Sequence, residues 1–179
     1  MLRTLESIDN ALEYEVMTIV QHIKNANEYT SELFDLPIVV RDFPSDNIGL
    51  RGRYGIYIFC FLSDLHIDRE MINKWSKPVF GIKFSNYYGE FDCNIGDCLY
   101  LGSSISKSLL TRVRQHYKEH YENAALLLNS KERNFIKPYI KCIVFPIKND
   151  VKKYRKMIIP VIEKKLHETL KPLCGSSRT

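Results

Sequence analysis

Three apolar runs dominate the hydrophobic pattern of the chain, and each has the length and composition of a buried strand. They cover residues 54–62, 98–104 and 139–147. Short runs rich in aromatic and branched side chains, bounded by turn-forming residues, are typical of strands in a sheet core. We expect the three runs to pair in a small, mostly antiparallel sheet.

Helical spacing of apolar residues predicts three longer helices around this sheet. The first lies near residues 5–31, and the last lies within residues 150–171. Between them, residues 104–123 form an amphipathic pattern that Ser104 or Ser106 would cap at its start.

The order of elements along the chain predicts an α+β fold. Residues 1–50 form an acidic helical arm, which either packs on the core or mediates dimerisation, and residues 51–179 form the main domain. A short helix near 68–75 and short strands at 38–40 and 79–84 complete the predicted elements.

Composition narrows the class of protein. The chain has 179 residues, of which 45% are hydrophobic and 26% charged, and this fits one globular domain. No run approaches the roughly 18 apolar residues of a membrane span, and no secretion signal is evident, so we expect a cytoplasmic protein without a membrane partner. The five cysteines fit reduced, buried thiols, since Cys93 and Cys98 lack a second pair that would complete a metal site.

Charge is distributed unevenly along the chain. Residues 1–50 hold 3 Lys+Arg and 9 Asp+Glu, for a net charge of −6. Residues 101–179 hold 17 and 6, for a net charge of +11. A basic C-terminal half favours a polyanionic partner such as nucleic acid, although a solvated lysine-rich surface is the simpler alternative.

The first strand raises a question of chemistry because it places Tyr54 and Tyr57 in an otherwise apolar run. A buried tyrosine needs a hydrogen-bond partner for its hydroxyl. A nearby carbonyl would suffice, and the alternative is that one hydroxyl takes part in a reaction. Strand alternation puts Tyr57 on the same face as Gly55, where the missing side chain would let another group approach.

Other polar residues lie on helical faces next to buried stripes. Arg112 and His116 are four residues apart and fit phosphate binding and proton transfer, although a solvated basic face is favoured for the pair alone. Glu163 lies on a buried stripe, so it needs either an ion pair, for which Arg112 is the obvious partner, or a metal ion such as Mg²⁺. Gly102 fits an ordinary strand-to-helix turn or the close approach of a phosphate.

Together these residues resemble the GIY-YIG nuclease family. The sequence reads GIY at residues 55–57 and YLG at residues 100–102, a mild variant of the second motif. Arg112 and His116 follow on the next helix, and Glu163 lies in the last helix, nine residues before a proline. All the motifs occur in the order of the family.

The match covers residues 55–175 and departs from the family in three places. Arg112 lies ten residues after Gly102, slightly further than in the commonest pattern of the family. Tyr57 and Tyr100 are 43 positions apart, so residues 63–97 resemble an insertion between the first two core strands. Gly175 stands where many members have an asparagine.

The resemblance implies a three-stranded antiparallel sheet flanked by helices and a divalent-metal-dependent phosphodiesterase. Tyr57 would act as general base or orient the attacking water, and Tyr100 would position the water or nucleophile. Arg112 would stabilise charge on the phosphoryl oxygens, and His116 would assist proton movement or contact the phosphate. Glu163 would hold a single Mg²⁺ or Mn²⁺ ion, one per active site.

The resemblance also implies double-stranded DNA as substrate, with five residues expected to contact it. The short chain has no separate DNA-binding domain, so it is most similar to a site-specific type II restriction endonuclease that acts as a homodimer. Alternatives are a mobile-element, phage or repair nuclease of the same family, a nuclease that cuts RNA, or a DNA-binding relic without catalysis. The five residues expected to contact nucleic acid are Gly102, Ser103, Ser104, Lys107 and Arg114.

Overall fold

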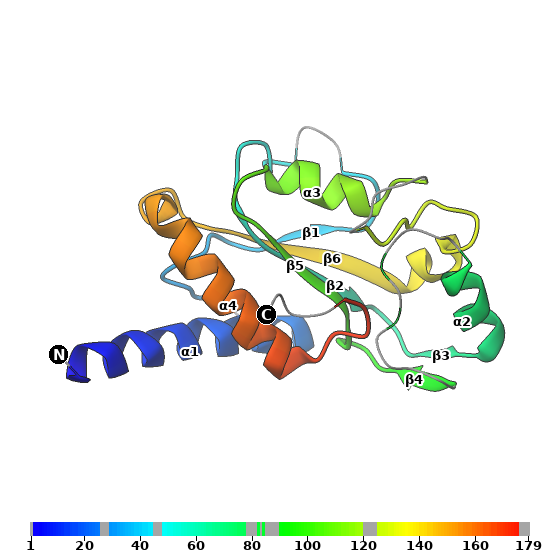
Figure 1. Ribbon diagram of the computed structural model, residues 1–179, viewed down its shortest axis with the longest axis horizontal. Coiled ribbons are helices and arrows are strands. Elements are labelled where there is room, and N and C mark those ends of the chain that lie inside the picture. Colours follow the sequence, from blue (N-terminus) through cyan, green and yellow to red (C-terminus); the bar gives the residue numbers. More distant parts are fainter. Residues whose placement is uncertain are drawn as a thin grey trace.

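The protein is described by a computed structural model in which a four-stranded antiparallel sheet forms the centre. Helices cover both faces of this sheet, and a two-stranded sheet with a short helix lies at one end of the molecule (Figure 1). The residues that the structure describes are 2–25, 29–44, 48–77, 82, 84, 90–119 and 125–175.

All neighbouring strands of the central sheet are antiparallel. In spatial order the strands are β1 (Ile38–Val40), β6 (Ile140–Pro146), β2 (Gly55–Phe61) and β5 (Cys98–Ser104). The central strand β2 therefore pairs with β6 on one side and with β5 on the other. The α+β class is confirmed, and each of the three apolar runs is a strand.

The sheet has four strands rather than the three that the resemblance implied. The additional strand β1 pairs with β6, and its register places Val40 opposite Cys142. All but one of the seven residues of β6 are buried, and an open edge beside such a strand would leave backbone groups unpaired. β1 covers part of that edge and buries Val40 in the core.

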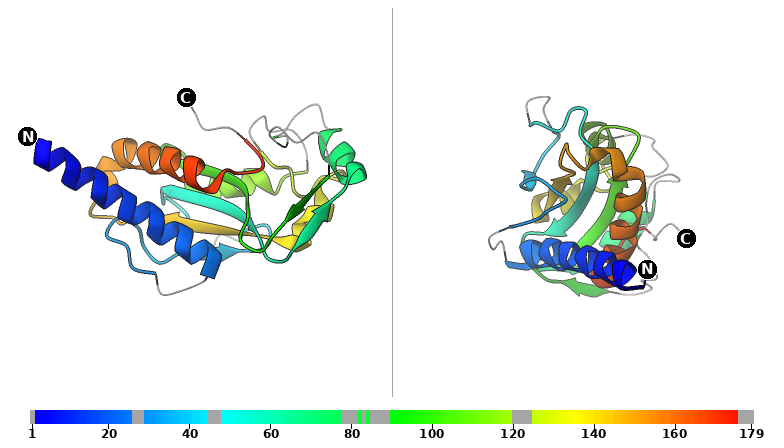
Figure 2. Two further views of the ribbon diagram at one scale, coloured as in Figure 1. Left: turned by 90° about the horizontal axis from the view of Figure 1, so that it is seen from below. Right: turned by 90° about the vertical axis from the view of Figure 1, so that its left-hand side faces the viewer.

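Two helices, α1 (Leu2–Asn25) and α4 (Arg155–Leu170), lie side by side on one face of the sheet (Figure 2). At their contact, Lys165 of α4 binds the carboxylates of Asp9 at 2.8 Å and Glu13 at 3.5 Å. The acidic arm therefore packs on the core, whereas dimerisation stays a prediction. The residues that these helices bury are Val16, Ile19, Val20, Ile23, Ile159, Ile162 and Leu166.

The opposite face is covered by α3 (Leu109–His116) (Figure 1). This helix begins after Ser108, whose hydroxyl accepts a hydrogen bond from the Thr111 N–H at 3.3 Å. The expected caps, Ser104 and Ser106, were wrong because sheet pairing extends β5 through Ser104.

The segment 63–97 contains elements of its own. They are β3 (Leu65–Ile67), α2 (Arg69–Ser76) and β4 (Phe91–Cys93). The short helix was predicted, and its cap is Asp68, which accepts a hydrogen bond from the Met71 N–H at 2.8 Å. The strand predicted at 79–84 lies outside the described residues, apart from residues 82 and 84.

Alternation along β2 divides the core into two clusters, as the sequence predicts. Its side chains on the α3 face are Tyr57, Phe59 and Phe61, and those on the face of α1 and α4 are Ile56, Ile58 and Cys60. The five cysteines are free thiols and are buried. Within the described ranges, no helix has the length and apolar character needed to cross a membrane.

Candidate active site

Tyr57 lies at the centre of the sheet, and its side chain is fully buried. The register of β2 and β5 places it opposite Gly102. A Cβ atom at Gly102 would lie 2.5 Å from the Tyr57 hydroxyl, which is closer than non-bonded atoms approach. Packing of the tyrosine ring is therefore sufficient reason for a glycine at this position.

The space beside Gly55 is filled by the backbone of β6. A Cβ atom there would lie 2.1 Å from the carbonyl oxygen of Phe145, and the residue has φ of +151°. The interpretation that Gly55 gives another group access to Tyr57 was wrong, because the neighbouring strand occupies that place.

His116 connects the end of α3 to Tyr57. The Leu126 N–H donates a hydrogen bond to Nδ1 of His116 at 3.1 Å, and Nε2 lies 3.1 Å from the Tyr57 hydroxyl. A backbone N–H can only donate, so Nδ1 is the acceptor and the proton of the neutral imidazole is on Nε2. Nε2–H therefore donates to the Tyr57 oxygen. Burial, with a smaller effect of the Arg112 cation, lowers the pKa of His116 to about 3, so the ring is neutral at physiological pH.

Tyr100 completes an aromatic cluster with these two residues. Its ring centroid lies 4.8 Å from that of His116 and 6.2 Å from that of Tyr57. Burial raises the pKa of Tyr57 well above its ordinary value, and the neighbouring Tyr100 adds to this shift. Tyr57 is therefore a neutral phenol, and the hydroxyl of Tyr100 is the partner for its proton. Tyr100 is 9% exposed and lies closer to the surface.

Arg112 of α3 brings a positive charge to this cluster. It is partly buried on α3, and its Nη1 donates a hydrogen bond to the Gln115 side-chain oxygen at 2.6 Å. Its charge lowers the pKa of both His116 and Tyr57, which places the guanidinium within electrostatic reach of the cluster. A bound anion near the cluster would be attracted by this charge.

Glu163 approaches the edge of the sheet from the other face. The Ser103 hydroxyl donates a hydrogen bond to its Oε2 at 2.7 Å. Ser103 pairs with Ile56, so it faces α4 rather than α3. In the described part of the chain no ion pair joins Glu163 to Arg112, so the ion pair proposed as the simpler explanation is not formed.

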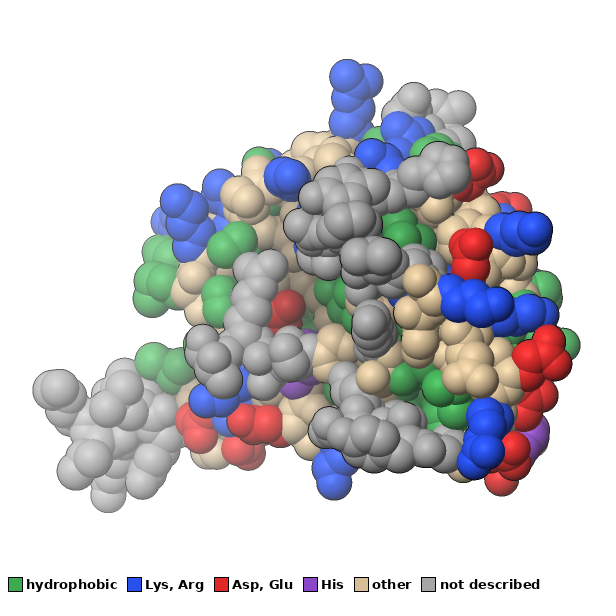
Figure 3. All heavy atoms as spheres, turned by 45° about the vertical axis from the view of Figure 1, so that its right-hand side comes forward, with side chains coloured by type: hydrophobic (Ala, Val, Ile, Leu, Met, Phe, Trp, Pro, Cys, Tyr) green, Lys and Arg blue, Asp and Glu red, His purple; other side chains and the backbone are tan. Residues whose placement is uncertain are grey.

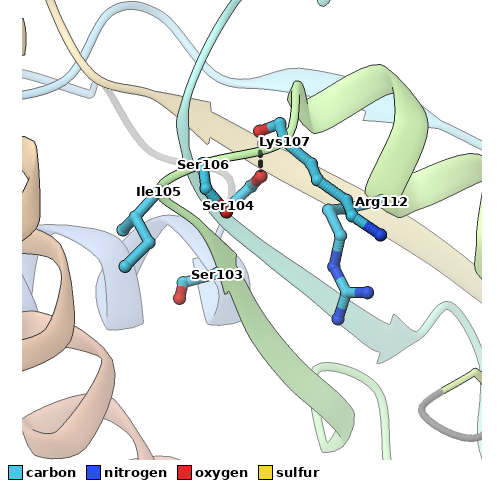
Figure 4. A pocket seen from close by; sticks show the side chains of 6 residues that line it. All are labelled: Ser103, Ser104, Ile105, Ser106, Lys107 and Arg112. Atoms are coloured by element: carbon cyan, nitrogen blue, oxygen red, sulfur yellow. Dashed lines mark hydrogen bonds between the residues drawn. The ribbon is translucent and has the colours of Figure 1, made fainter.

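A pocket of about 180 Å³ lies where the two faces meet at β5. Figure 4 shows the side chains of Ser103 and Arg112 on opposite sides of this strand. The volume is below the roughly 300–1,000 Å³ of small-molecule sites, so it suits a group such as a phosphate better than a whole cofactor. The lining residues are Ser103, Ser104, Ile105, Ser106, Lys107 and Arg112.

Four of the five residues predicted to contact nucleic acid lie at β5 or in this pocket, and one does not. Arg114 points to the far side of α3, where its Nε donates a hydrogen bond to the Pro44 carbonyl at 2.9 Å and its guanidinium lies 5.4 Å from the Phe43 ring centre. Those at β5 or in the pocket are Gly102, Ser103, Ser104 and Lys107.

Glu163 has the chemistry of a magnesium ligand. Its carboxylate is partly exposed, and Ser103 binds one of its two oxygens. Within the described ranges no three His, Cys, Asp or Glu side chains form a metal-binding group, so an ion at Glu163 would rely on this carboxylate and on water. Mg²⁺ commonly keeps several waters in this way.

Two groups behind the cluster were not predicted from the sequence. The Leu126 N–H fixes the His116 tautomer, and a backbone donor has no sequence signature. Arg133 lies in a polar stretch that resembles an exposed loop, yet it is fully buried. No pattern in one sequence would have identified either group.

Comparisons with protein-family models, curated proteins and solved structures found no match.

Proposed function

We propose that this protein is a divalent-metal-dependent endonuclease that hydrolyses phosphodiester bonds in double-stranded DNA at specific sites, in the manner of a type II restriction enzyme. The observation that carries the proposal is the contact of Tyr57, Tyr100 and His116 beside the charge of Arg112. These residues come from two strands and a helix, and the sequence motifs predict them as one set.

The environment of each residue assigns its part in the reaction. Tyr57 is buried and neutral, so it orients Tyr100 and the attacking water instead of acting as a phenolate. His116 is buried, so it holds the Tyr57 hydroxyl and does not contact phosphate. Tyr100, nearer the surface, positions the water.

The two charged residues would act on the phosphate. Arg112 lines the pocket and would stabilise negative charge that develops on the phosphoryl oxygens. Glu163 would hold one Mg²⁺ or Mn²⁺ ion, which stabilises the leaving oxygen when it is bound. The Ser103 hydrogen bond fixes one carboxylate oxygen and so orients the other.

The surface charge supports an anionic partner. Figure 3 shows Lys and Arg side chains along the upper margin of one face, and Asp and Glu side chains interspersed with further Lys and Arg on its right-hand and lower parts. Residues 101–179, which contain α3 and α4, carry the net charge of +11. Such a surface favours binding to a phosphate backbone.

Cleavage of plasmid and phage-length DNA tests the proposal. We expect discrete fragments with Mg²⁺, and no cleavage with EDTA or in Glu163→Gln. Glu168→Gln is the matched control, since Glu168 is an exposed carboxylate on the same helix. A smear would contradict site specificity. Intact DNA whose binding persists in EDTA would contradict catalysis and identify a DNA-binding relic of the fold.

A homodimer belongs to the same proposal, because one active site cuts one strand. We expect sedimentation of the full chain on a two-fold symmetric DNA site to give two copies per duplex. Accumulation of nicked plasmid by a monomer would contradict this part alone.

A further inference from the structure

Arg133 is a fully buried arginine that precedes a short 3-10 helix (Asn134–Tyr139) and lies outside the proposed catalytic set. Its Nε donates a hydrogen bond to the Trp75 carbonyl at 3.1 Å, and its Nη1 donates to the Leu126 carbonyl at 2.9 Å. The guanidinium also lies 4.6 Å from the centre of the Trp75 ring. Arg133 therefore connects the last turn of α2 to the backbone at Leu126.

The Leu126 residue joins this arginine to His116. Its carbonyl accepts from Arg133, and its N–H donates to Nδ1 of His116 at 3.1 Å. Two residues later, the Leu128 N–H donates to the His116 carbonyl at 2.8 Å. The segment is thus held against His116 by its backbone on both sides of Leu127.

Leu127 has a backbone conformation that needs such support. Its φ is +57°, in the left-handed region, where the Cβ atom of a residue other than glycine lies too close to the backbone carbonyl oxygen. Strained residues persist where surrounding contacts determine their conformation. The hydrogen bonds that Leu126 and Leu128 make with His116, together with the bond from Arg133 to the Leu126 carbonyl, hold Leu127 in this conformation.

Packing alone does not explain an arginine at this position. Among the described residues its Nη2 has no hydrogen-bond partner, although the atom is buried. An apolar side chain of similar size is often as stable as a buried cation, or more so. What distinguishes Arg133 from an apolar residue is therefore the pair of hydrogen bonds that it donates to the Trp75 and Leu126 carbonyls.

We propose that Arg133 is a positioning residue that holds the Leu126 backbone so that Nδ1 of His116 stays unprotonated and Nε2–H points at the Tyr57 hydroxyl. The effect on DNA cleavage rests on the proposed nuclease function, whereas the effect on the imidazole tautomer does not. Segment 63–97 then contributes to the active site through Trp75, in addition to any contact it makes with DNA.

Nitrogen NMR of the full chain labelled with ¹⁵N-histidine tests the tautomer directly. We expect His116, assigned by its loss in His116→Gln, to show an acceptor-type Nδ1 and a protonated Nε2. In uniformly ¹⁵N-labelled protein, a coupling across the hydrogen bond between the Leu126 nitrogen and Nδ1 is also expected. A protonated Nδ1 in the wild-type protein would overturn the proposal without any variant.

Variants at position 133 test the arginine. Arg133→Met removes both donated bonds, and we expect the His116 signals to show a mixture of tautomers. Arg133→Lys keeps one donor for the Leu126 carbonyl and should show the wild-type tautomer. This variant tests the proposal even if Arg133→Met does not fold. Arg69→Met, an exposed change on α2, is the control. Wild-type signals in Arg133→Met, or mixed tautomers in a folded Arg133→Lys, would overturn the proposal.

Cleavage kinetics separate this inference from the proposed function. If the wild-type protein cuts DNA, Arg133→Met should lower kcat by up to about 100-fold with little change in KM, because misplacement of the tyrosine affects the reaction more than binding. An unchanged kcat beside a shifted tautomer would overturn the link to catalysis. If the wild-type protein does not cut DNA, the nuclease proposal fails and the NMR result alone decides the role of Arg133.

Discussion

Polar groups on the α3 face of the sheet are buried among aromatic rings, whereas Glu163 on the α4 side is partly exposed at the edge of β5. Tyr57 and His116 hydrogen-bond each other, and burial keeps both neutral. Among the residues that the structure describes, Ser103 is the one hydrogen-bond donor to Glu163.

This difference in burial indicates two roles: the buried pair sets the geometry of the site, and Glu163 contributes charge. A buried, uncharged pair cannot move or ionise easily, so it suits the orientation of other groups. A partly exposed carboxylate keeps room for a metal ion and substrate. Substitutions in the buried cluster should therefore lower both stability and rate, whereas substitutions at the edge of β5 should lower the rate alone.

The largest expected effect is at Arg112, which comes from the α3 face but reaches the pocket. Arg112→Met should lower kcat for DNA cleavage by about 100- to 1,000-fold, because a preorganised charge on the phosphoryl oxygens is lost. Its free energy of unfolding should change by less than about 0.5 kcal/mol. Lys118→Met removes an exposed charge after the same helix and should change neither quantity. A large loss of stability in Arg112→Met would contradict the distinction between the buried cluster and the edge of β5.

Next in size is the effect of a methyl group at Gly102. Gly102→Ala should lower the free energy of unfolding by about 1–3 kcal/mol, because the new Cβ would overlap the Tyr57 hydroxyl. Denaturant titration measures this change. Gly102→Ala should cost less in a Tyr57→Phe background, because the overlapping oxygen is absent there. An equal cost in both backgrounds would contradict the overlap with the Tyr57 hydroxyl.

Acid should destabilise the α3 face through His116. Its folded-state pKa is about 3, against an ordinary 6.5, so between these values the unfolded chain binds a proton that the folded protein excludes. The stabilisation is complete above pH 6.5 and is lost as the pH falls, by up to about 1.4 kcal/mol per pH unit. His116→Gln should flatten this slope in unfolding measurements. His66→Gln is the control, because Asp92 raises the pKa of His66 instead of lowering it. An equal slope with and without His116 would contradict the buried, neutral imidazole.

The smallest effect is expected at Ser103. Ser103→Ala should raise the Mg²⁺ concentration for half-maximal cleavage by about 10-fold, since groups that orient a metal ligand tune its affinity. Denaturation midpoints should stay close to wild type. Ser106→Ala, at an exposed position lining the same pocket, should leave the Mg²⁺ requirement unchanged. An equal shift in both variants would show that the Glu163 hydrogen bond is not responsible.

The sequence predicted the strands well because their apolar runs are long and clearly bounded. Alternation also assigned Tyr57 to its face correctly, since that periodicity is a property of the strand itself. The fourth strand was harder to place, because three residues carry little pattern and the pairing of Val40 with Cys142 is non-local. The cap at Ser108 was missed because three nearby serines offer equivalent signals.

The sequence predicted which residues form the candidate site, but only partly how their side chains are arranged in space. Helical spacing placed Glu163 on the buried side of its helix but gave no information on which face of the sheet that helix would cover. Since α4 packs opposite α3, the carboxylate meets Ser103 and not Arg112. The contacts of Leu126 and Arg133 depend on a left-handed turn in a loop, which local composition does not specify.

The position of β6 between β1 and β2 has a consequence for biosynthesis. The ribosome makes β1, β2 and β5 first, yet β1 has no strand to pair with until β6 emerges. Pairing between distant segments slows folding and leaves strand edges exposed in the meantime. A nascent chain halted before Ile140 would carry the tyrosines of both motifs and the arginine of α3 without the strand that joins the sheet. Assembly of the candidate active site is therefore a late event, completed only after the C-terminal third of the chain has been made.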